Sequence, residues 1–381
     1  MTISAIISEY NPIHKGHVYH MEQTRELTGC DKVMVIMSGS FTQRGEPAVF
    51  SKWARAEAAV KAGADIVLEL PTVFATAGAE RFAAGAVSIA ESTCIADFLS
   101  FGSECGNIEQ IKIAADFFAN ESDEYKETLK TLLARGMTFA AARTRAAETL
   151  LGRDEADVIR EPNNILAVEY MKAIIKQSSR MKPVTVKRVG SSYDDEVVHG
   201  DYPSALAIRR ALRSGTYEAG CDEAPVFADA MFEPLMWRIR TSSPEELAKI
   251  AEIGEGLEYR IIDAAASAHS YEELIAAIKS KRYTLARIKR ALLNIFLGIT
   301  DDLLHTIDFL PCYARVLAVK KESRDLLSLL AKASKIPVIT SPVGIDHPSL
   351  LLDIEATDLR TVIAGGESCW GEDYSRKLLI I

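Results

Sequence analysis

The stretch that decides the fold is residues 3–17, Ile3-Ser4-Ala5-Ile6-Ile7-Ser8-Glu9-Tyr10-Asn11-Pro12-Ile13-His14-Lys15-Gly16-His17. An apolar run typical of a buried strand passes through a proline turn into a helix start that carries His-x-Gly-His. The glycine lets the backbone approach an anion, and the helix start offers unpaired N–H groups at its positive end. Two imidazoles three residues apart can face one phosphate together. The pattern predicts a nucleotide site with chemistry at the α-phosphate of ATP.

Strands and helices alternate over roughly the first two hundred residues. Apolar segments predict strands over residues 3–7, 32–37, 66–70, 96–101 and 184–189. Helical periodicity lies between the early strands, over residues 17–27, 51–62 and 79–91. Short strands rich in Val and Ile, separated by helices, pair in parallel through right-handed crossovers. We therefore expect an α/β fold with a Rossmann-like parallel sheet and a ligand beyond the carboxyl ends of its strands.

The pattern becomes helical beyond residue 108. The helices form an expected insertion around residues 108–180, before the last strand of the nucleotide-binding domain. Beyond residue 221 the alternation fades into helices, with short strands predicted over 314–319 and 336–339. A chain of 381 residues exceeds one ordinary core. We expect a nucleotide-binding domain over 1–220 and a mostly helical domain over 221–381.

The composition is that of a soluble globular protein. A net charge of −9 argues against indiscriminate coating of nucleic acid, although a local basic face is compatible with it. The chain has no apolar run of the roughly 20 residues that span a bilayer, and its N-terminus lacks an export leader. The cysteines are scattered without a C-x-x-C pair, so we expect reduced thiols, no disulfide partner and a cytoplasmic protein. They are Cys30, Cys94, Cys105, Cys221, Cys312 and Cys369.

A metal site is the first alternative for His14, His17 and His20. At about 100° per residue the third ring is rotated well away from the other two, and no Cys or Asp stands near to complete a shell. We therefore expect no metal ligands here and interpret His20 as a partly exposed helix residue. The other alternative for His14 and His17 is a pair of polar residues in a turn.

A second motif, residues 202–212, follows the last predicted strand and begins Tyr202-Pro203-Ser204. Ser204 is a natural N-cap, and its hydroxyl and the neighbouring N–H groups can reach β- and γ-phosphate oxygens. Arg209 can reach the same anion with its planar guanidinium. Such a helix alone is mostly structural, but its coupling to His-x-Gly-His makes the pattern specific.

These two motifs together resemble the nucleotidyltransferase superfamily of adenylate-forming enzymes with HIGH-type motifs. A longer set resembles the bacterial tRNA(Met) cytidine acetate ligase family over almost the whole chain. In order, these motifs are Glu9-Tyr10-Asn11-Pro12-x-His14-x-Gly16-His17, Met37-Ser38-Gly39-Ser40-Phe41-x-Gln43-Arg44-Gly45-Glu46-Pro47-Ala48, Ser51-Lys52-Trp53-Ala54-Arg55, Phe101-Gly102-Ser103-Glu104, Pro162-Asn163-Asn164-Ile165-Leu166, Lys281-Arg282-Tyr283-Thr284 and Tyr313-Ala314-Arg315-Val316-Leu317. The superfamily's Ser-Ser-Thr-x-Ile-Arg appears as Ser204-Ala205-Leu206-Ala207-Ile208-Arg209, which leaves two fewer hydroxyls for the terminal phosphates.

The resemblance implies an ATP-dependent ligase. ATP and acetate would give acetyl-adenylate and pyrophosphate, with Mg²⁺ on the phosphates. The acetyl group would pass to the wobble cytidine of elongator tRNA(Met) as N4-acetylcytidine, and His14 and His17 would stabilise charge on the α-phosphate. The implied ATP contacts are Ile7, Ser8, Glu9, Tyr10, Asn11, Pro12, Ile13, His14, Lys15, Gly16, His17, Val18, Tyr19, His20, Gly102, Asn163 or Asn164, Arg188, Ser204 and Arg209.

The C-terminal domain is expected to contribute to tRNA binding. Basic residues around one aromatic predict contacts with an RNA backbone, and a solvated helix face fits the charge equally well. The candidates are Lys281, Arg282, Arg287, Lys289 and Arg290. Arg44, Lys52 and Arg55 could bind acetate, pyrophosphate or RNA. Two other functions stay open: a nucleotidyltransferase that adenylates a phosphorylated small molecule, and a non-catalytic RNA-binding protein that kept the nucleotide fold.

Overall fold

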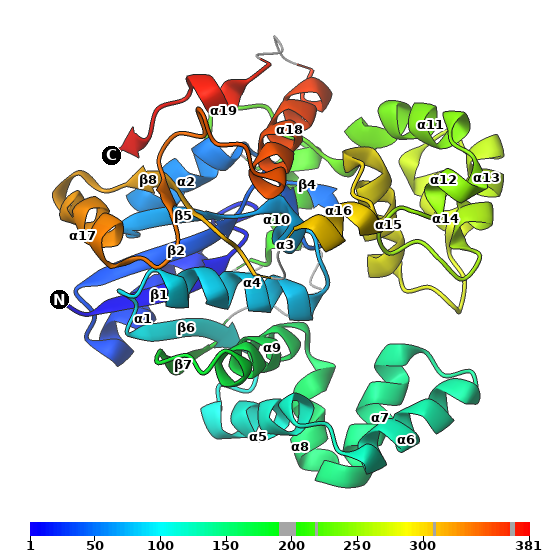
Figure 1. Cartoon of the computed structure of the whole chain (residues 1–381), viewed down its shortest axis with the longest axis horizontal. Coiled ribbons are helices and arrows are strands. Elements are labelled where there is room, and N and C mark those ends of the chain that lie inside the picture. Colours follow the sequence, from blue (N-terminus) through cyan, green and yellow to red (C-terminus); the bar gives the residue numbers. More distant parts are fainter. Residues whose placement is uncertain (190–202, 218–219, 308–309, 366–369) are drawn as a thin grey trace.

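The fold is built on one mostly parallel sheet, as the computed structural model of residues 1–189, 203–217, 220–307, 310–365 and 370–381 shows. Tyr202 and Cys369 lie outside these described residues. The strand order is β10-β8-β5-β2-β1-β6-β7, with β9 paired to β8 (Figure 1). The strands are β1 (Ile3–Ser8), β2 (Lys32–Ser38), β5 (Ile66–Leu70), β6 (Phe98–Ser103), β7 (Lys182–Lys187), β8 (Ala314–Val319), β9 (Val338–Ile339) and β10 (Leu379–Ile380). A separate hairpin pairs β3 (Phe41–Thr42) with β4 (Glu46–Pro47).

The five strands predicted in the first two hundred residues pair in parallel, which confirms the prediction. The central strands β1, β2 and β5 are buried almost throughout and read as continuous apolar runs, whereas the edge strand β7 is partly exposed. One face of the sheet packs on α1 (Lys15–Thr28) and α2 (Lys52–Lys61) through residues such as Met21 and Trp53. The other face packs on α4 (Ala79–Ser92) and α9 (Pro162–Lys176). The sheet is thus the middle layer of an α/β sandwich, and the predicted fold class is confirmed.

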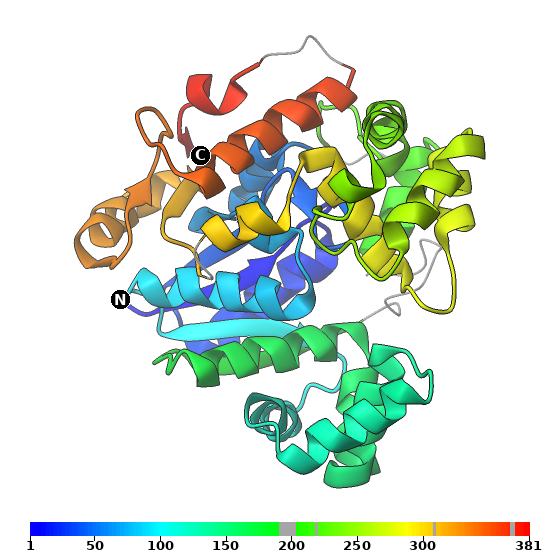
Figure 2. The ribbon, with the colours of Figure 1, turned by 45° about the vertical axis from the view of Figure 1, so that its right-hand side comes forward.

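The predicted helical insertion lies below α9 and beside β7 (Figure 2). It consists of α5 (Ile108–Ala119), α6 (Asp123–Ala134), α7 (Phe139–Leu151), α8 (Arg153–Asp157) and the 3₁₀ turn Val158–Arg160. Phe118 and Tyr125 join its apolar interior to the main core. The other elements around the sheet are α3 (Thr72–Ala75), α10 (Ala205–Arg213), α17 (Asp325–Ala333), α18 (Pro348–Ile363), α19 (Glu372–Ser375) and the 3₁₀ turn Lys321–Ser323.

The C-terminal part divides in a way that the sequence analysis did not anticipate. A helical lobe comprises the 3₁₀ turn Ala228–Met231, α11 (Phe232–Thr241), α12 (Pro244–Leu247), α13 (Leu257–Ser267), α14 (Tyr271–Ile278), α15 (Leu285–Leu297) and α16 (Asp301–Thr306). The chain then returns to the sheet, where β8 pairs antiparallel with β5. The expected helical domain over 221–381 is therefore not continuous: residues 314–381 belong with the sheet, because the fully buried strand β8 needs a partner and cover on both faces. No helix in the described ranges is long and apolar enough to cross a membrane.

A buried ionic cluster joins this returning segment to the sheet. The Nζ of Lys52 lies 2.9 Å from a carboxylate oxygen of Glu69 and 2.9 Å from one of Asp373. Arg315 on β8 lies 3.0 Å from Asp373 and 3.3 Å from Glu69. All four side chains are at most 2% exposed. Lys52 therefore serves as an internal counter-ion.

Candidate active site

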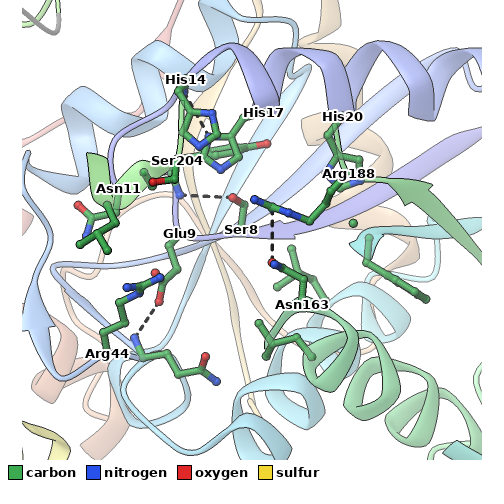
Figure 3. Close-up of a pocket in the computed structure, with 18 of the residues that line it drawn as sticks. Ser8, Glu9, Asn11, His14, His17, His20, Arg44, Asn163, Arg188 and Ser204 are labelled. Carbon is green, nitrogen blue, oxygen red and sulfur yellow. Dashed lines mark hydrogen bonds between the residues drawn. The ribbon is translucent and has the colours of Figure 1, made fainter. Parts of the chain in front are cut away.

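The start of α1 is capped by two histidine side chains that each accept a main-chain N–H group. His14 is the N-cap, and its Nδ1 accepts the N–H of Gly16 at 3.1 Å. The Nδ1 of His17 accepts the N–H of His14 at 3.2 Å, so the pair forms a capping box. The two rings are stacked with centroids 3.8 Å apart (Figure 3). Because Nδ1 is an acceptor in both rings, each neutral ring carries its proton on Nε2 and can donate it to a phosphate oxygen.

Both imidazoles are held neutral. Burial, reinforced by Arg188 and Arg209, lowers the pKa of His14 to about 4. Burial and the neighbouring His14 lower the pKa of His17 well below its usual value. The rings therefore act as N–H donors, and the positive charge near them comes from the two arginines.

We expect these rings to make the protein sensitive to mild acid. Burial lowers the pKa of His20 to about 4, below the value of about 6.5 in an unfolded chain. The free energy of unfolding is therefore highest above pH 6.5 and decreases as the pH falls toward the folded-state pKa. The decrease should reach up to about 2 kcal/mol per ring between pH 6.5 and pH 5. Urea unfolding at both pH values should show a smaller decrease in the free energy of unfolding for His20→Gln than for the wild type. An equal decrease would contradict this account.

An open cavity lies at the carboxyl edge of the sheet between β1 and β6. The strand order reverses there, which is the position where α/β sheets bind ligands. The cavity has a volume of about 180 Å³. Its lining includes these predicted ATP contacts: Ile7, Ser8, Glu9, Tyr10, Asn11, His14, His17, His20, Gly102, Asn163, Arg188, Ser204 and Arg209.

The remaining predicted ATP contacts lie elsewhere. Gly16 and Tyr19 line a smaller adjoining pocket. Pro12 and Ile13 line a different pocket, beside α2. Lys15 is exposed and Val18 is half-buried on α1, and neither is among the residues that line the cavity or the adjoining pocket. His20 is half-buried, and its Nε2 lies 3.0 Å from the Ser100 hydroxyl.

The structure separates the roles of Asn163 and Asn164. Asn164 is 3% exposed, and its side-chain oxygen accepts the N–H groups of Glu104 and Cys105 at 2.9 and 3.2 Å. Asn163 lines the cavity, where its side-chain oxygen accepts a long 3.5 Å hydrogen bond from Arg188. Asn163 is thus placed to meet a ligand, and Asn164 fixes the loop after β6.

Alanine substitutions should therefore have different effects at these two positions. Asn164→Ala leaves two N–H groups without their acceptor and should destabilise the fold by about 1–3 kcal/mol. Asn163→Ala removes one hydrogen bond to the Glu104 carboxylate, so it should lower the urea midpoint less than Asn164→Ala does, and it should weaken ATP binding. Paired unfolding curves and ATP titrations measure both effects, and the reverse pattern would refute the assignment.

The second motif supports the loop after β1. Ser204 caps α10 by accepting the N–H of Ala207 at 3.0 Å. The guanidinium of Arg209 donates to the main-chain oxygen of Asn11 at 2.9 Å. The Asn11 side chain in turn accepts the N–H of Val49 at 2.8 Å. Arg209 therefore positions the loop as well as lining the cavity.

Arg44, Lys52 and Arg55 have three different environments. Arg44 lines the cavity, whereas Lys52 belongs to the buried ionic cluster. Arg55 is 1% exposed, and it donates to main-chain oxygens at the ends of β1 and β2 and just before α2. Its acceptors are Glu9 at 2.7 Å, Ser38 at 3.0 Å, Phe50 at 3.1 Å and Gly39. Arg55 thus ties together the two loops that form this side of the cavity.

The five predicted RNA contacts are not one solvated face. Lys281 and Arg282 are exposed, and Arg287 donates to Glu255 at 3.1 Å. Like Arg287, the other two lie on α15 and have partners within the protein: Lys289 pairs with Glu46 of β4, and Arg290 forms two hydrogen bonds with Glu252.

Sequence reasoning missed the apolar wall of the cavity. Phe82, Phe101, Leu166 and Tyr170 line it. The Tyr170 ring centroid lies 6.5 Å from that of Phe82 and 5.7 Å from that of Phe101. Burial and the Glu9 carboxylate raise the pKa of Tyr170, so this phenol stays protonated. In the sequence these residues show the same periodicity as core residues, so the pattern does not indicate that they line a cavity.

The chain is similar to known proteins over its whole length. A sequence profile of the family described as HIGH Nucleotidyl Transferase matches residues 1–370. The tRNA(Met) cytidine acetate ligase of Clostridium perfringens (strain SM101 / Type A) is 38% identical over 382 residues, with 94% of each chain covered. That of Acetivibrio thermocellus is 37% identical over 416 residues, with 100% of each chain covered. The crystal structure of apo Thermotoga maritima TmcAL (form I) aligns with a TM-score of 0.93, and that of TmcAL bound with alpha-thio ATP (Form II) with 0.90; both are 32% identical with 100% coverage of each chain.

Proposed function

The chain belongs to the HIGH nucleotidyltransferase family and, within it, to the tRNA(Met) cytidine acetate ligases, and from this premise we propose how it uses ATP and acetate to modify tRNA. It activates acetate as acetyl-adenylate and transfers the acetyl group to N4 of the wobble cytidine of elongator tRNA(Met). AMP and pyrophosphate are the other products. The observation that carries this proposal is the pair of Nε2–H donors at the β1–α1 turn, inside the cavity where the strand order reverses.

The first step is a displacement at the α-phosphorus. An acetate oxygen bonds to phosphorus, the bond to the pyrophosphate oxygen breaks, and the electron pair leaves with pyrophosphate. His14 and His17 donate from Nε2 to the oxygens on which charge builds, and Arg209 and Ser204 face the β- and γ-phosphates. Gly102, with no side chain, lets the nucleoside approach the end of β6.

The other cavity residues suit the nucleoside and the metal. Asn163 offers an amide to an adenine edge or a ribose, and Arg188 offers a planar cation. Mg²⁺ prefers carboxylate and phosphate oxygens. Glu9 is the only carboxylate among the described lining residues, so Mg²⁺ would be held by Glu9 and the phosphates, where it neutralises phosphate charge.

The second step brings the wobble cytidine to the cavity. Its N4 attacks the acetyl carbon, the carbon–oxygen bond to AMP breaks, and the proton on N4 is released. We assign tRNA backbone contacts to the exposed Lys281 and Arg282 and to Arg287, at one side of the helical lobe. Lys289 and Arg290 keep the internal pairs described above.

Residues 1–220 together with 314–381 form the adenylating body, and the lobe contributes to tRNA binding. The enzyme works in the cytoplasm, where its tRNA and ATP are available.

One assay tests the proposal. The protein is incubated with labelled acetate, ATP and total tRNA, and the tRNA is digested to nucleosides. Label should appear in N4-acetylcytidine and require ATP. Pyrophosphate exchange that needs no acetate would instead favour adenylation of a phosphorylated small molecule. An absence of ATP turnover would favour an RNA-binding protein without catalysis.

A further inference from the structure

We propose that Gln43 and Arg44 bind the carboxylate of the acid substrate and that Phe82, Leu166 and Tyr170 restrict the length of its acyl chain. This inference rests on the proposed function, because it assigns the acid that the adenylation consumes to one corner of the same cavity. Its first basis is position. Arg44 and Glu9 lie on the opposite side of the cavity from Asn163 and Arg188, with the histidine pair above and between them (Figure 3).

The second basis is a polar group that lacks a protein partner. The side-chain nitrogen Nε2 of Gln43 is buried, lines the cavity and has no hydrogen-bond partner among the described residues. A buried amide N–H left without an acceptor costs about 1–3 kcal/mol, so native proteins usually supply an acceptor. A carboxylate oxygen in the cavity would be that acceptor.

The third basis is the rigid presentation of these side chains. Gln43 and Arg44 form the tip of the β3–β4 hairpin, which the N–H of Gly45 closes by donating to the Thr42 carbonyl at 3.0 Å. The N–H of Gln43 donates to the Glu9 carboxylate at 2.8 Å. Gly45 has a φ of +75°, and a Cβ there would lie 2.5 Å from the main-chain carbon of Lys289, so α15 packs directly against the hairpin tip. The donors are thereby fixed before substrate binds, which reduces the cost of ordering them.

The fourth basis is the chemistry of the corner. A short carboxylic acid needs donors for two oxygens and an apolar surface for its alkyl group. The guanidinium of Arg44 has the planar geometry that suits a carboxylate. Phe82 and Tyr170 are 2% and 5% exposed, and with Leu166 they form an apolar wall that has little room to move.

Acetate-dependent pyrophosphate exchange in the full-length protein, without tRNA, tests the carboxylate site. Arg44→Ala should raise the KM for acetate about 10- to 100-fold, while the KM for ATP changes less than about twofold. Gln43→Ala should raise the KM for acetate about 5- to 10-fold. Arg44→Lys should raise the KM for acetate less than Arg44→Ala does, because lysine keeps the positive charge but lacks the planar guanidinium. Arg135→Ala, at an exposed arginine on the insertion, is the matched control and should leave both constants unchanged.

Chain-length selectivity tests the wall. Leu166→Ala should raise the preference for propionate over acetate about 10-fold or more, since one methylene is typically worth 10- to 200-fold in a shaped pocket. An ATP titration of each variant reports that the fold is intact.

Three results would overturn the inference while the proposed function stands: an unchanged KM for acetate in both Gln43→Ala and Arg44→Ala, an equal rise in the KM for ATP, or a rise only in the KM for tRNA during transfer. The last result would place a phosphate of RNA against Arg44. If the wild type binds ATP but shows no acetate-dependent exchange, the proposed function itself fails and the inference falls with it.

Discussion

Replacing His17 with alanine should slow acetate-dependent pyrophosphate exchange about a hundredfold or more. The substitution removes an Nε2–H donor placed where charge builds on the α-phosphate, and one such donor is worth about 3 kcal/mol. The pKa of His17 lies well below its usual value, so the lost group is a neutral donor and the net charge of the site at neutral pH does not change. Initial rates of exchange at saturating ATP and acetate measure the effect.

A matched variant separates this catalytic role from helix capping. His17 is also the N3 residue of a capping box, in which Gln is a natural alternative. His17→Gln should therefore keep the wild-type urea midpoint and still lose most of the exchange rate. His305→Ala, at an exposed histidine of α16, should change neither property. Wild-type exchange in His17→Ala would remove this ring from the mechanism.

Lys52→Ala should destabilise the protein by about 3–5 kcal/mol, which is the usual cost of breaking a buried ion pair from one side. The Glu69 and Asp373 carboxylates would remain buried with Arg315 as their main counter-ion. Because Asp373 belongs to α19 and Lys52 to α2, the C-terminal segment should loosen first. The midpoint of urea unfolding and hydrogen exchange of residues 314–365 and 370–381 measure the change.

The control for this variant is Lys61→Ala on the same helix. Lys61 pairs with Glu57 at the surface, where both side chains are well exposed, so the change should leave the urea midpoint nearly unchanged. If Lys52→Ala kept wild-type stability and instead raised the KM for acetate or pyrophosphate, the structural role given to Lys52 would be wrong.

Much of the fold could be predicted from local sequence patterns. The strand over 314–319 was predicted from its Val- and Leu-containing apolar run, and β8 occupies these same residues. Its antiparallel pairing with β5, some 250 residues away, had no local signal. The division of the C-terminal half could not be predicted for this reason, since a strand's partner depends on which sheet edge is left open by the rest of the chain.

The site divides in the same way. The histidine pair and the Ser204–Arg209 helix could be predicted as helix starts because capping acts over a few residues, and His14 and Ser204 are the N-caps of α1 and α10. Lys289 was predicted to contact RNA from the basic charge around it. Its ion pair with Glu46 could not be predicted, because Glu46 lies far away in the sequence. Phe82 was missed because a residue that lines a cavity and a residue in the core have the same periodicity.

The most direct test of the account follows the oxygen atoms of acetate. The enzyme is supplied with acetate carrying ¹⁸O in its carboxylate, together with ATP and tRNA, and the released AMP is examined by mass spectrometry. Attack of the carboxylate on the α-phosphorus at the β1–α1 turn predicts one ¹⁸O atom in each AMP formed during acetyl transfer. Unlabelled AMP, or label in inorganic phosphate beside ADP, would contradict it.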